Sequence, residues 1–138
     1  AYAQGLSLLT KASEDYKFQI SPADVVSIWK GGCIIRSSLL YQFDKAFAGD
    51  QSLPNVLLDG SIAELLKQKE EAIRQVLSQA ITARIPVAAM TSALSYFDAY
   101  GSSRLPTNLV QAQRDFFGAH TYQRIDKEGV FHTEWNAG

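Results

Sequence analysis

The sequence has 138 residues, of which 46% are hydrophobic and 20% are charged, the balance of one ordinary domain with its own core. Its formal net charge of -1 provides no overall positive field for a phosphate backbone or an anionic membrane. The longest apolar-leaning run, Ile85 to Leu94, is far shorter than the roughly 20 residues that span a bilayer. The single Cys33 and two distant histidines predict neither a disulfide nor a metal site. We therefore expect a soluble, cytoplasmic protein that binds neither nucleic acid nor membrane.

The chain begins without a methionine and opens directly in a helical pattern. Tyr2, Leu6 and Leu9 fall on one apolar stripe, and no capping residue precedes them. Because a natural terminus is usually loose or capped, this pattern indicates a helix cut within its length. We expect a fragment whose missing portion lies upstream, although the sequence does not say why it starts at Ala1.

Further helices are expected along most of the chain, from local start and stop signals. Ser21-Pro22 is typical of a helix start, and Gly31-Gly32 is typical of a break. Ser61 is expected to cap the longest helix, and Gly118 to end the last one in the left-handed conformation. The predicted helices are 22–29, 33–47, 61–82, 86–100 and 106–117, with a short helical turn in the loop 50–60.

The residues after Gly118 are bulky but have no helical stripe. Aromatic and β-branched residues without periodicity of their own favour an arm that docks on another surface, and a neighbouring subunit is the natural candidate. We predict an all-α, multi-helical domain over residues 1–118, followed by an extended C-terminal arm over residues 119–138.

Two familiar catalytic spacings are present but lack their partners. Tyr41 and Lys45 have the Tyr-x-x-x-Lys spacing of short-chain dehydrogenases, yet no Gly-rich phosphate turn follows a strand. Ser27 and Lys30 imitate a Ser-x-x-Lys pair without its companion motifs. Cys33 follows a glycine pair, and a small, closely packed core residue is the favoured interpretation over a reactive thiol.

Arg114 and His120 stand on either side of the predicted helix end at Gly118. Arg114 has a structural role open to it, pairing with the helix dipole or with Asp115, and a functional one as a planar fork for phosphate or carboxylate. A chain reversal at Gly118 would return His120 towards Arg114. Together the two side chains would hold an anionic, hydroxylated ligand.

Five stretches carry long, ordered and unusual motifs. They are WKGGCIIRS (29–37), TSALSYFD (91–98), RLP (104–106), QAQRDFFGAHTY (111–122) and FHTEW (131–135). Together they resemble the C-terminal region of the 6-phosphogluconate dehydrogenase family, and the resemblance covers essentially the whole chain. Departures are modest: Lys30 stands where arginine is frequent, and the loop 101–103 is plainer than the basic loop often found there.

The resemblance implies a reaction and its partners. Family members oxidatively decarboxylate 6-phosphogluconate to ribulose 5-phosphate and CO2, pass a hydride to NADP and need no metal. Their subunits combine an N-terminal Rossmann domain, an all-helical domain and a tail that reaches into the partner of a homodimer. The lysine base and glutamate acid would lie before Ala1, as would the NADP site. This chain would thus contribute dimer interface and no catalytic residue, and alone it is expected to be inactive, with NADP or NAD preference left open.

The family motif that carries an arginine and a histidine into the neighbouring subunit's site matches at Arg114 and His120. The resemblance implies that they hold the phosphate end of the substrate. Trp29 and Arg36 are interpreted as structural, Trp29 in the core and Arg36 as a partly buried cation whose partner the sequence does not identify. The alternative hypothesis is a non-catalytic helical module for dimerisation or structure.

Overall fold

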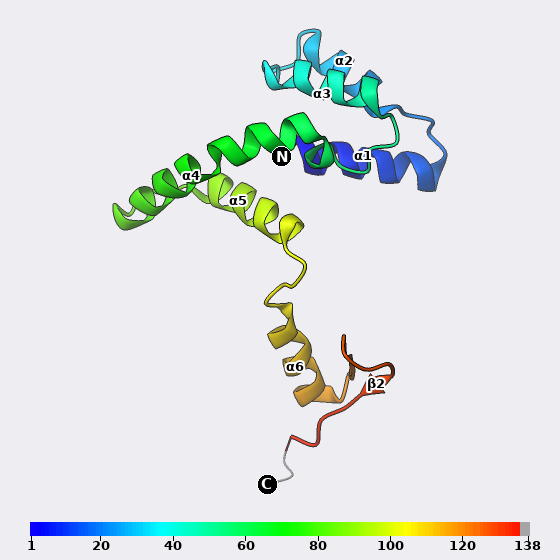
Figure 1. The fold of residues 1–138 in the computed structure, drawn as a ribbon, viewed down its shortest axis with the longest axis vertical. Coiled ribbons are helices and arrows are strands. Elements are labelled where there is room, and N and C mark those ends of the chain that lie inside the picture. Colours follow the sequence, from blue (N-terminus) through cyan, green and yellow to red (C-terminus); the bar gives the residue numbers. More distant parts are fainter. Residues whose placement is uncertain (136–138) are drawn as a thin grey trace. The chain divides into compact units, whose positions relative to one another are not determined.

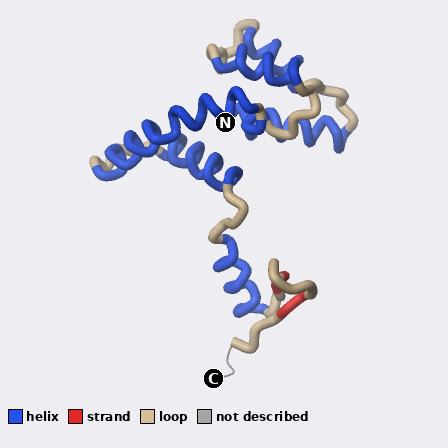
Figure 2. The backbone as a smooth tube through the Cα atoms, viewed as in Figure 1, coloured by secondary structure: helices blue, strands red, loops and turns tan. Residues whose placement is uncertain are grey.

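The computed structural model of the chain describes residues 1–135. The chain forms two compact units, residues 1–90 and residues 91–138. The last three residues of the predicted arm, 136–138, lie outside the described residues. Helices make up most of the first unit and about half of the described part of the second, and the only strands of the described part form one short hairpin near its end (Figure 2). The predicted all-α class is confirmed.

The first unit contains four α-helices and one 3₁₀ turn, and a fifth helix begins in it and continues into the second unit. The helices are α1 (Tyr2–Tyr16), α2 (Pro22–Lys30), α3 (Leu39–Gly49), η1 (Val56–Leu58), α4 (Gly60–Thr82) and α5 (Ala88–Gly101). Helices α2 and α3 lie side by side, with α1 against α2 (Figure 1). Their apolar faces enclose the core of the unit, which includes Leu6, Val26, Leu40, Phe43, Phe47, Val56 and Ile62.

The local signals placed most helix ends within a few residues. Helix α2 begins at Pro22 and is followed by Gly31, and Gly32 adopts a φ of 121° that only glycine takes readily. The long helix α4 ends at Thr82 as predicted, but its cap is Asp59 and not Ser61. The Asp59 carboxylate accepts hydrogen bonds from the backbone N–H groups of Ser61 and Ile62, both at 3.0 Å, and so satisfies two free donors of the first turn.

The prediction of a helix from Cys33 was wrong for its first six residues. Helix α3 begins at Leu39, and residues 33–38 form turns and irregular backbone. The Ile35 carbonyl accepts a hydrogen bond from the hydroxyl of Tyr2 in α1, a contact between residues far apart in sequence. The apolar periodicity of α3 continues into residues 33–38 and favours a helix there. It contains no sign of a contact with a distant residue that holds the segment in another conformation.

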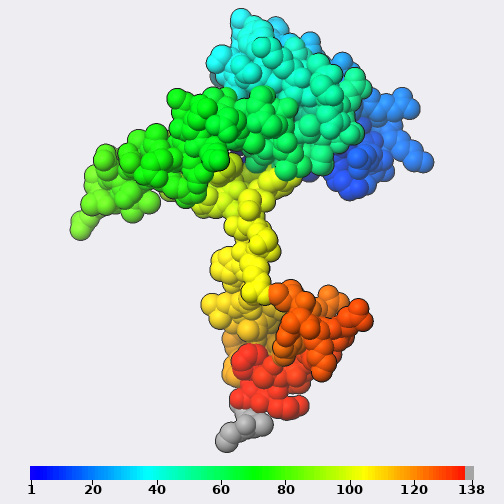
Figure 3. All heavy atoms as spheres, viewed as in Figure 1, coloured from blue at the N-terminus to red at the C-terminus, as the bar shows by residue number. Residues whose placement is uncertain are grey.

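The second unit, described through residue 135, contains α6 (Thr107–Gly118), β1 (Tyr122–Gln123) and β2 (Val130–Phe131). The two strands are antiparallel, and Tyr122 faces Phe131 across the ladder with ring centroids 6.2 Å apart. The hairpin lies alongside α6 (Figure 3). The sequence did not predict it, because two-residue strands have no alternation to detect.

The burial of the second unit differs from that of the first. Within residues 91–135, no hydrophobic side chain is fully buried, and the one buried residue is Asp115, whose exposed fraction is 0%. Several large apolar side chains are exposed there, among them Leu109, Phe116, Phe117 and Ile125. The conformation of this unit therefore depends on polar contacts to a carboxylate more than on an apolar core.

Among the described residues, no helix combines the length and the apolar character that crossing a membrane requires.

Candidate functional site

Arg114 lies on α6, one turn before the helix ends at Gly118, and its side chain is exposed. Its Nη1 donates a hydrogen bond of 3.3 Å to Oε1 of Gln111, one turn earlier on the same helix. An exposed guanidinium has donors in a rigid fork that suits phosphate or carboxylate oxygens.

His120 folds back against the end of α6. A Cβ atom added to Gly118 would lie 2.9 Å from Nε2 and 3.1 Å from Cδ2 of His120, so the imidazole lies directly against the glycine. Arg114 and Gly118 are four residues apart on α6 and share one face of the helix. The structure therefore brings Arg114 and the His120 ring to the same face.

The left-handed residue at the end of α6 is not Gly118, the residue that the sequence predicted. Gly118 is the last helical residue, and the left-handed position is occupied by Ala119, with φ 49° and ψ 39°. The N–H of Ala119 donates to the Asp115 carbonyl at 2.9 Å, which satisfies one of the last carbonyls of the helix. What Gly118 provides is space, because any side chain there would meet the imidazole of His120.

Thr121, which follows His120, also has a positive φ of 62°. Its N–H donates to Oδ1 of Asp115 at 2.9 Å, and its carbonyl accepts from Nε2 of Gln111 at 2.5 Å. Side chains of α6 therefore hold both polar backbone groups of the residue next to His120.

Asp115 is the centre of a hydrogen-bonded cluster that joins α6 to the arm. Oδ1 accepts from the N–H of Thr121 and from Nδ1 of His132, each at 2.9 Å. Oδ2 accepts from the N–H of Thr133 at 3.0 Å and from Nε1 of Trp135 at 2.9 Å. Four donors match the acceptor capacity of one carboxylate, so its burial leaves no lone pair without a partner.

The charge states of the cluster follow from these contacts. Burial acts to raise the pKa of Asp115, but the hydrogen bonds from His132, Thr133 and Trp135 outweigh it and lower that pKa to about 2. The hydrogen bond to Asp115 raises the pKa of His132, and burial opposes the shift only in part. Because the ionised Asp115 can only accept, Nδ1 of His132 carries the proton in this pair.

Sequence reasoning missed the contacts of Gln111 and Asp115 with the residues around His120. Asp115 was considered only as an ion-pair partner of Arg114, whereas its carboxylate lies in the cluster and Arg114 bonds to Gln111. A usable signal was present in the arm, where His132, Thr133 and Trp135 place three donor groups within four residues. Such a run indicates a buried acceptor elsewhere in the chain.

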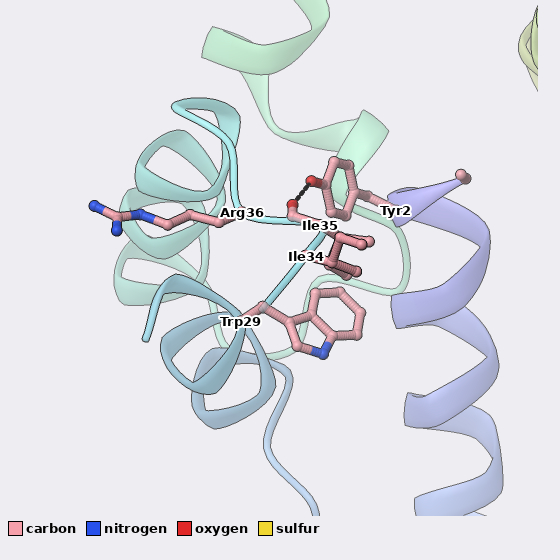
Figure 4. Close-up of a pocket in the computed structure, with 6 residues that line it drawn as sticks. Tyr2, Trp29, Ile34, Ile35 and Arg36 are labelled. Atoms are coloured by element: carbon pink, nitrogen blue, oxygen red, sulfur yellow. Dashed lines mark hydrogen bonds between the residues drawn. The ribbon is translucent and has the colours of Figure 1, made fainter. Parts of the chain in front are cut away.

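The first unit contains a cavity of about 510 Å³ beside the start of α1 (Figure 4). Its walls include Tyr2, Trp29, Ile34 and Ile35, and the rings of Tyr2 and Trp29 are 6.1 Å apart. Arg36 points away from these side chains and is exposed, so the expectation of a partly buried cation was wrong. Trp29 is half-buried.

The other motif residues have structural surroundings. Nζ of Lys30 lies 2.6 Å from Oδ2 of Asp44 and 5.6 Å from the centre of the Tyr41 ring, so its charge is engaged by a carboxylate and an aromatic face. Cys33 is a free, partly exposed thiol. Within the described part of the chain, no group of three or more His, Cys, Asp and Glu side chains is placed to hold a metal ion.

Comparison with known proteins gives one consistent result. The family model described as 6-phosphogluconate dehydrogenase, C-terminal domain, matches residues 1–135. The decarboxylating 6-phosphogluconate dehydrogenase of Lactococcus lactis strain IL1403 is 48% identical over 135 residues, and the NADP(+)-dependent enzyme of Bacillus subtilis is 45% identical. Both matches cover 98% of this chain and 29% of the relative. The chain thus spans less than a third of the length of these relatives.

A solved structure of Plasmodium falciparum 6-phosphogluconate dehydrogenase has the same fold over this region. It superposes with a TM-score of 0.89 at 40% identity and covers 97% of this chain and 29% of its own. That enzyme is described in its apo form, with its cofactor NADP+ and with its substrate 6-phosphogluconate.

Proposed function

The chain belongs to the family of 6-phosphogluconate dehydrogenase C-terminal domains, and we propose that it performs this role in an enzyme that decarboxylates 6-phosphogluconate. The reaction yields ribulose 5-phosphate and CO2 and reduces NADP. The proposal is supported by the likeness to enzymes named for this activity.

The single observation that carries a role in substrate binding is the common face of Arg114 and His120 at the end of α6. A planar cationic fork beside an imidazole suits a phosphate group. Both side chains are exposed, so they cannot enclose a substrate by themselves. We assign them to the phosphate end of 6-phosphogluconate in the site of the neighbouring subunit.

A homodimer is supported by the exposed apolar side chains of the second unit. Its large apolar side chains are exposed and, within residues 91–135, no hydrophobic side chain is fully buried. Exposed apolar area of this kind is typical of a surface that another chain covers. The arm would provide part of that interface and would bring Arg114 and His120 to the partner's site.

NADP is assigned to a domain outside this chain. Dinucleotide sites use a glycine-rich turn between a parallel strand and a helix. The strands of residues 1–135 form only one antiparallel hairpin, in which each strand has two residues. Residues of this chain are therefore given no part in hydride transfer, and we expect the isolated chain to be inactive.

A cytoplasmic location is the favoured one, on the evidence of the single free Cys33. A rice relative that is 47% identical carries the word chloroplastic in its name. Imaging of the tagged full-length protein decides between these locations.

The test is 6-phosphogluconate-dependent NADP reduction by the complete subunit that carries this chain, with Arg114→Ala beside the wild type across a substrate titration. Loss of a charge-assisted contact to phosphate costs about 1.5–3 kcal/mol, so KM should rise by one to two decades with kcat little changed. Arg84→Ala, which removes another exposed arginine, is the matched control and should leave KM unaltered.

A well-folded but inactive wild-type subunit would favour the alternative, a non-catalytic helical module for dimerisation. A large fall in kcat at unchanged KM for Arg114→Ala would contradict the binding role.

A further inference from the structure

The two residues that flank His120 both have an unfavourable backbone conformation. Ala119 and Thr121 have φ values of 49° and 62°, in the left-handed region. This region is disfavoured for residues with a Cβ atom, and most of all for a β-branched residue such as threonine. Such a conformation persists only where the surrounding structure holds it in place.

Two side chains of α6 hold this segment at Thr121. Asp115 accepts from its N–H at 2.9 Å, and Nε2 of Gln111 donates to its carbonyl at 2.5 Å. Gln111 and Asp115 are four residues apart and so share one helix face. The regular helix thereby sets the position of Thr121, and with it the position of the preceding residue.

Gln111 has a second contact that ties it to the other half of the site. Its Oε1 accepts from Nη1 of Arg114 at 3.3 Å, while its Nε2 holds the Thr121 carbonyl. One partly buried amide therefore contacts Arg114 directly and His120 through the neighbouring residue.

We propose that Gln111 and Asp115 are positioning residues, which hold Thr121 in its left-handed conformation and thereby fix His120 against Gly118 on the face of Arg114. The inference rests on the proposed function, since it gives these residues a role in binding the phosphate end of the substrate. Gln111 is the better residue to test, because Asp115 also holds His132, Thr133 and Trp135.

The test is Gln111→Ala in the complete subunit, assayed by 6-phosphogluconate-dependent NADP reduction. Loss of a neutral hydrogen bond that positions His120 should raise KM about two- to tenfold and leave kcat within about twofold. The matched control is Gln113→Ala, which removes the same side chain from an exposed position of the same helix and should change neither value.

A double-mutant cycle separates positioning from a general structural effect. If Gln111 acts through His120, Gln111→Ala should change KM by less than about twofold in a His120→Ala background. Additive effects of the two substitutions would overturn the proposal. Should Gln111→Ala not fold, as judged by thermal unfolding, Gln111→Met keeps the length of the side chain without its amide and is subject to the same criteria.

Arg114→Ala, measured in the same series, distinguishes this inference from the proposed function. An inactive wild-type subunit would remove the proposed function, and an unchanged KM for Arg114→Ala would remove the binding role of Arg114 on which the inference depends. A raised KM for Arg114→Ala together with an unchanged KM for Gln111→Ala would overturn the inference alone.

Discussion

Gly118 allows His120 to lie against the end of α6. The substitution Gly118→Ala, which adds one methyl group, tests whether this contact matters for substrate binding. In Gly118→Ala the new Cβ would lie 2.9 Å from Nε2 of His120, too close for the ring to stay in place. The ring is the end of a rotatable side chain, so we expect it to move and the fold to remain. Loss of the His120 contact should raise KM for 6-phosphogluconate about three- to tenfold.

Gly49→Ala is the matched control for Gly118→Ala. Gly49 is also the last residue of its helix, α3, but no atom lies within 4 Å of a Cβ added there. It should leave KM unchanged and stabilise the protein by up to about 1 kcal/mol, since alanine restricts the unfolded chain more than glycine does. If both variants have the wild-type KM, the close approach of His120 to Gly118 is irrelevant to substrate binding.

Asp115 shows how a buried charge can organise a small unit. An isolated carboxylate is costly to bury, but four donors share this one and the cost of burial is offset. Removal of a single donor leaves a buried charge incompletely paired, which is more damaging than the loss of an exposed contact. The arm and the His120 segment are therefore coupled through one residue.

At the scale of elements, sequence reasoning succeeded where the controlling interactions are local. Pro22, Gly31 and the apolar periodicity of residues 62–81 act within a few residues, so α2 and α4 were predicted nearly to their ends. It failed for residues 33–38, where the Tyr2 hydroxyl holds the Ile35 carbonyl from another helix.

The same distinction explains the result at the candidate site. The sequence pointed to Arg114 and His120 because their types and their spacing around a helix end indicate anion binding, and because the motif resembles a family; their role in binding stays a prediction. The roles of Asp115 and Gln111 depend on contacts with Trp135 and Thr121, which only the folded arm creates. The predicted boundary at residue 118 stays a prediction.

The contact between Asp115 and His132 makes the docking of the arm depend on pH. The pKa of His132 is raised from 6.5, so its contribution is complete below pH 6.5 and is lost as the pH rises through the higher value of the folded state. The pKa of Asp115 is lowered from 3.8 to about 2, so its contribution is present above pH 3.8 and is lost as the pH falls towards 2. The arm should be held most firmly between these limits, at about pH 4 to 6.5.

Urea unfolding of the wild type and of His132→Gln, measured from pH 5 to pH 9, checks this dependence. The difference in unfolding free energy should be largest near pH 5 to 6 and should decrease as the pH rises, because only the wild type loses a proton from residue 132. Glu134 adds to the raised pKa of His132, so Glu134→Gln should move the decrease to lower pH. A difference that is constant over this range would exclude the linkage.

At the scale of the whole molecule, the second unit has apolar surface without an apolar core of its own in residues 91–135. Phe116, Phe117 and Val130 are exposed on the elements that carry or adjoin the Asp115 cluster. If a partner subunit covers these residues, the interface and the substrate-binding face are built from the same helix and arm. Dimer formation and completion of the site would then be one event.

Deletion of residues 119–138 from the complete subunit should therefore weaken dimerisation at least about tenfold, because the arm contributes apolar area that a partner covers. Sedimentation at low protein concentration measures the dissociation constant. Circular dichroism shows whether the helices persist in the shortened chain, so that a loss of fold is not mistaken for a loss of interface. A shortened protein with helices intact that remains fully dimeric contradicts the role of the arm.

Mixed dimers decide whether Arg114 serves its own subunit or the partner's. One subunit carries Arg114→Ala, and the other keeps Arg114 but has a replacement of the lysine base that the family resemblance leads us to expect before Ala1, so only the first has a working reaction centre. If Arg114 acts on the partner's site, that centre receives an intact arginine, and the mixed dimer should show the wild-type KM at half the wild-type kcat. If Arg114 acts within its own subunit, the KM should rise by the same one to two decades as in the Arg114→Ala homodimer.

Differently tagged subunits, purified over two affinity columns, give the mixed dimer free of both homodimers. We expect the first result. Asp115 holds the arm against α6, so the helix face that carries Arg114 lies next to the surface that a partner would cover, and Arg114 is then within reach of the partner's site.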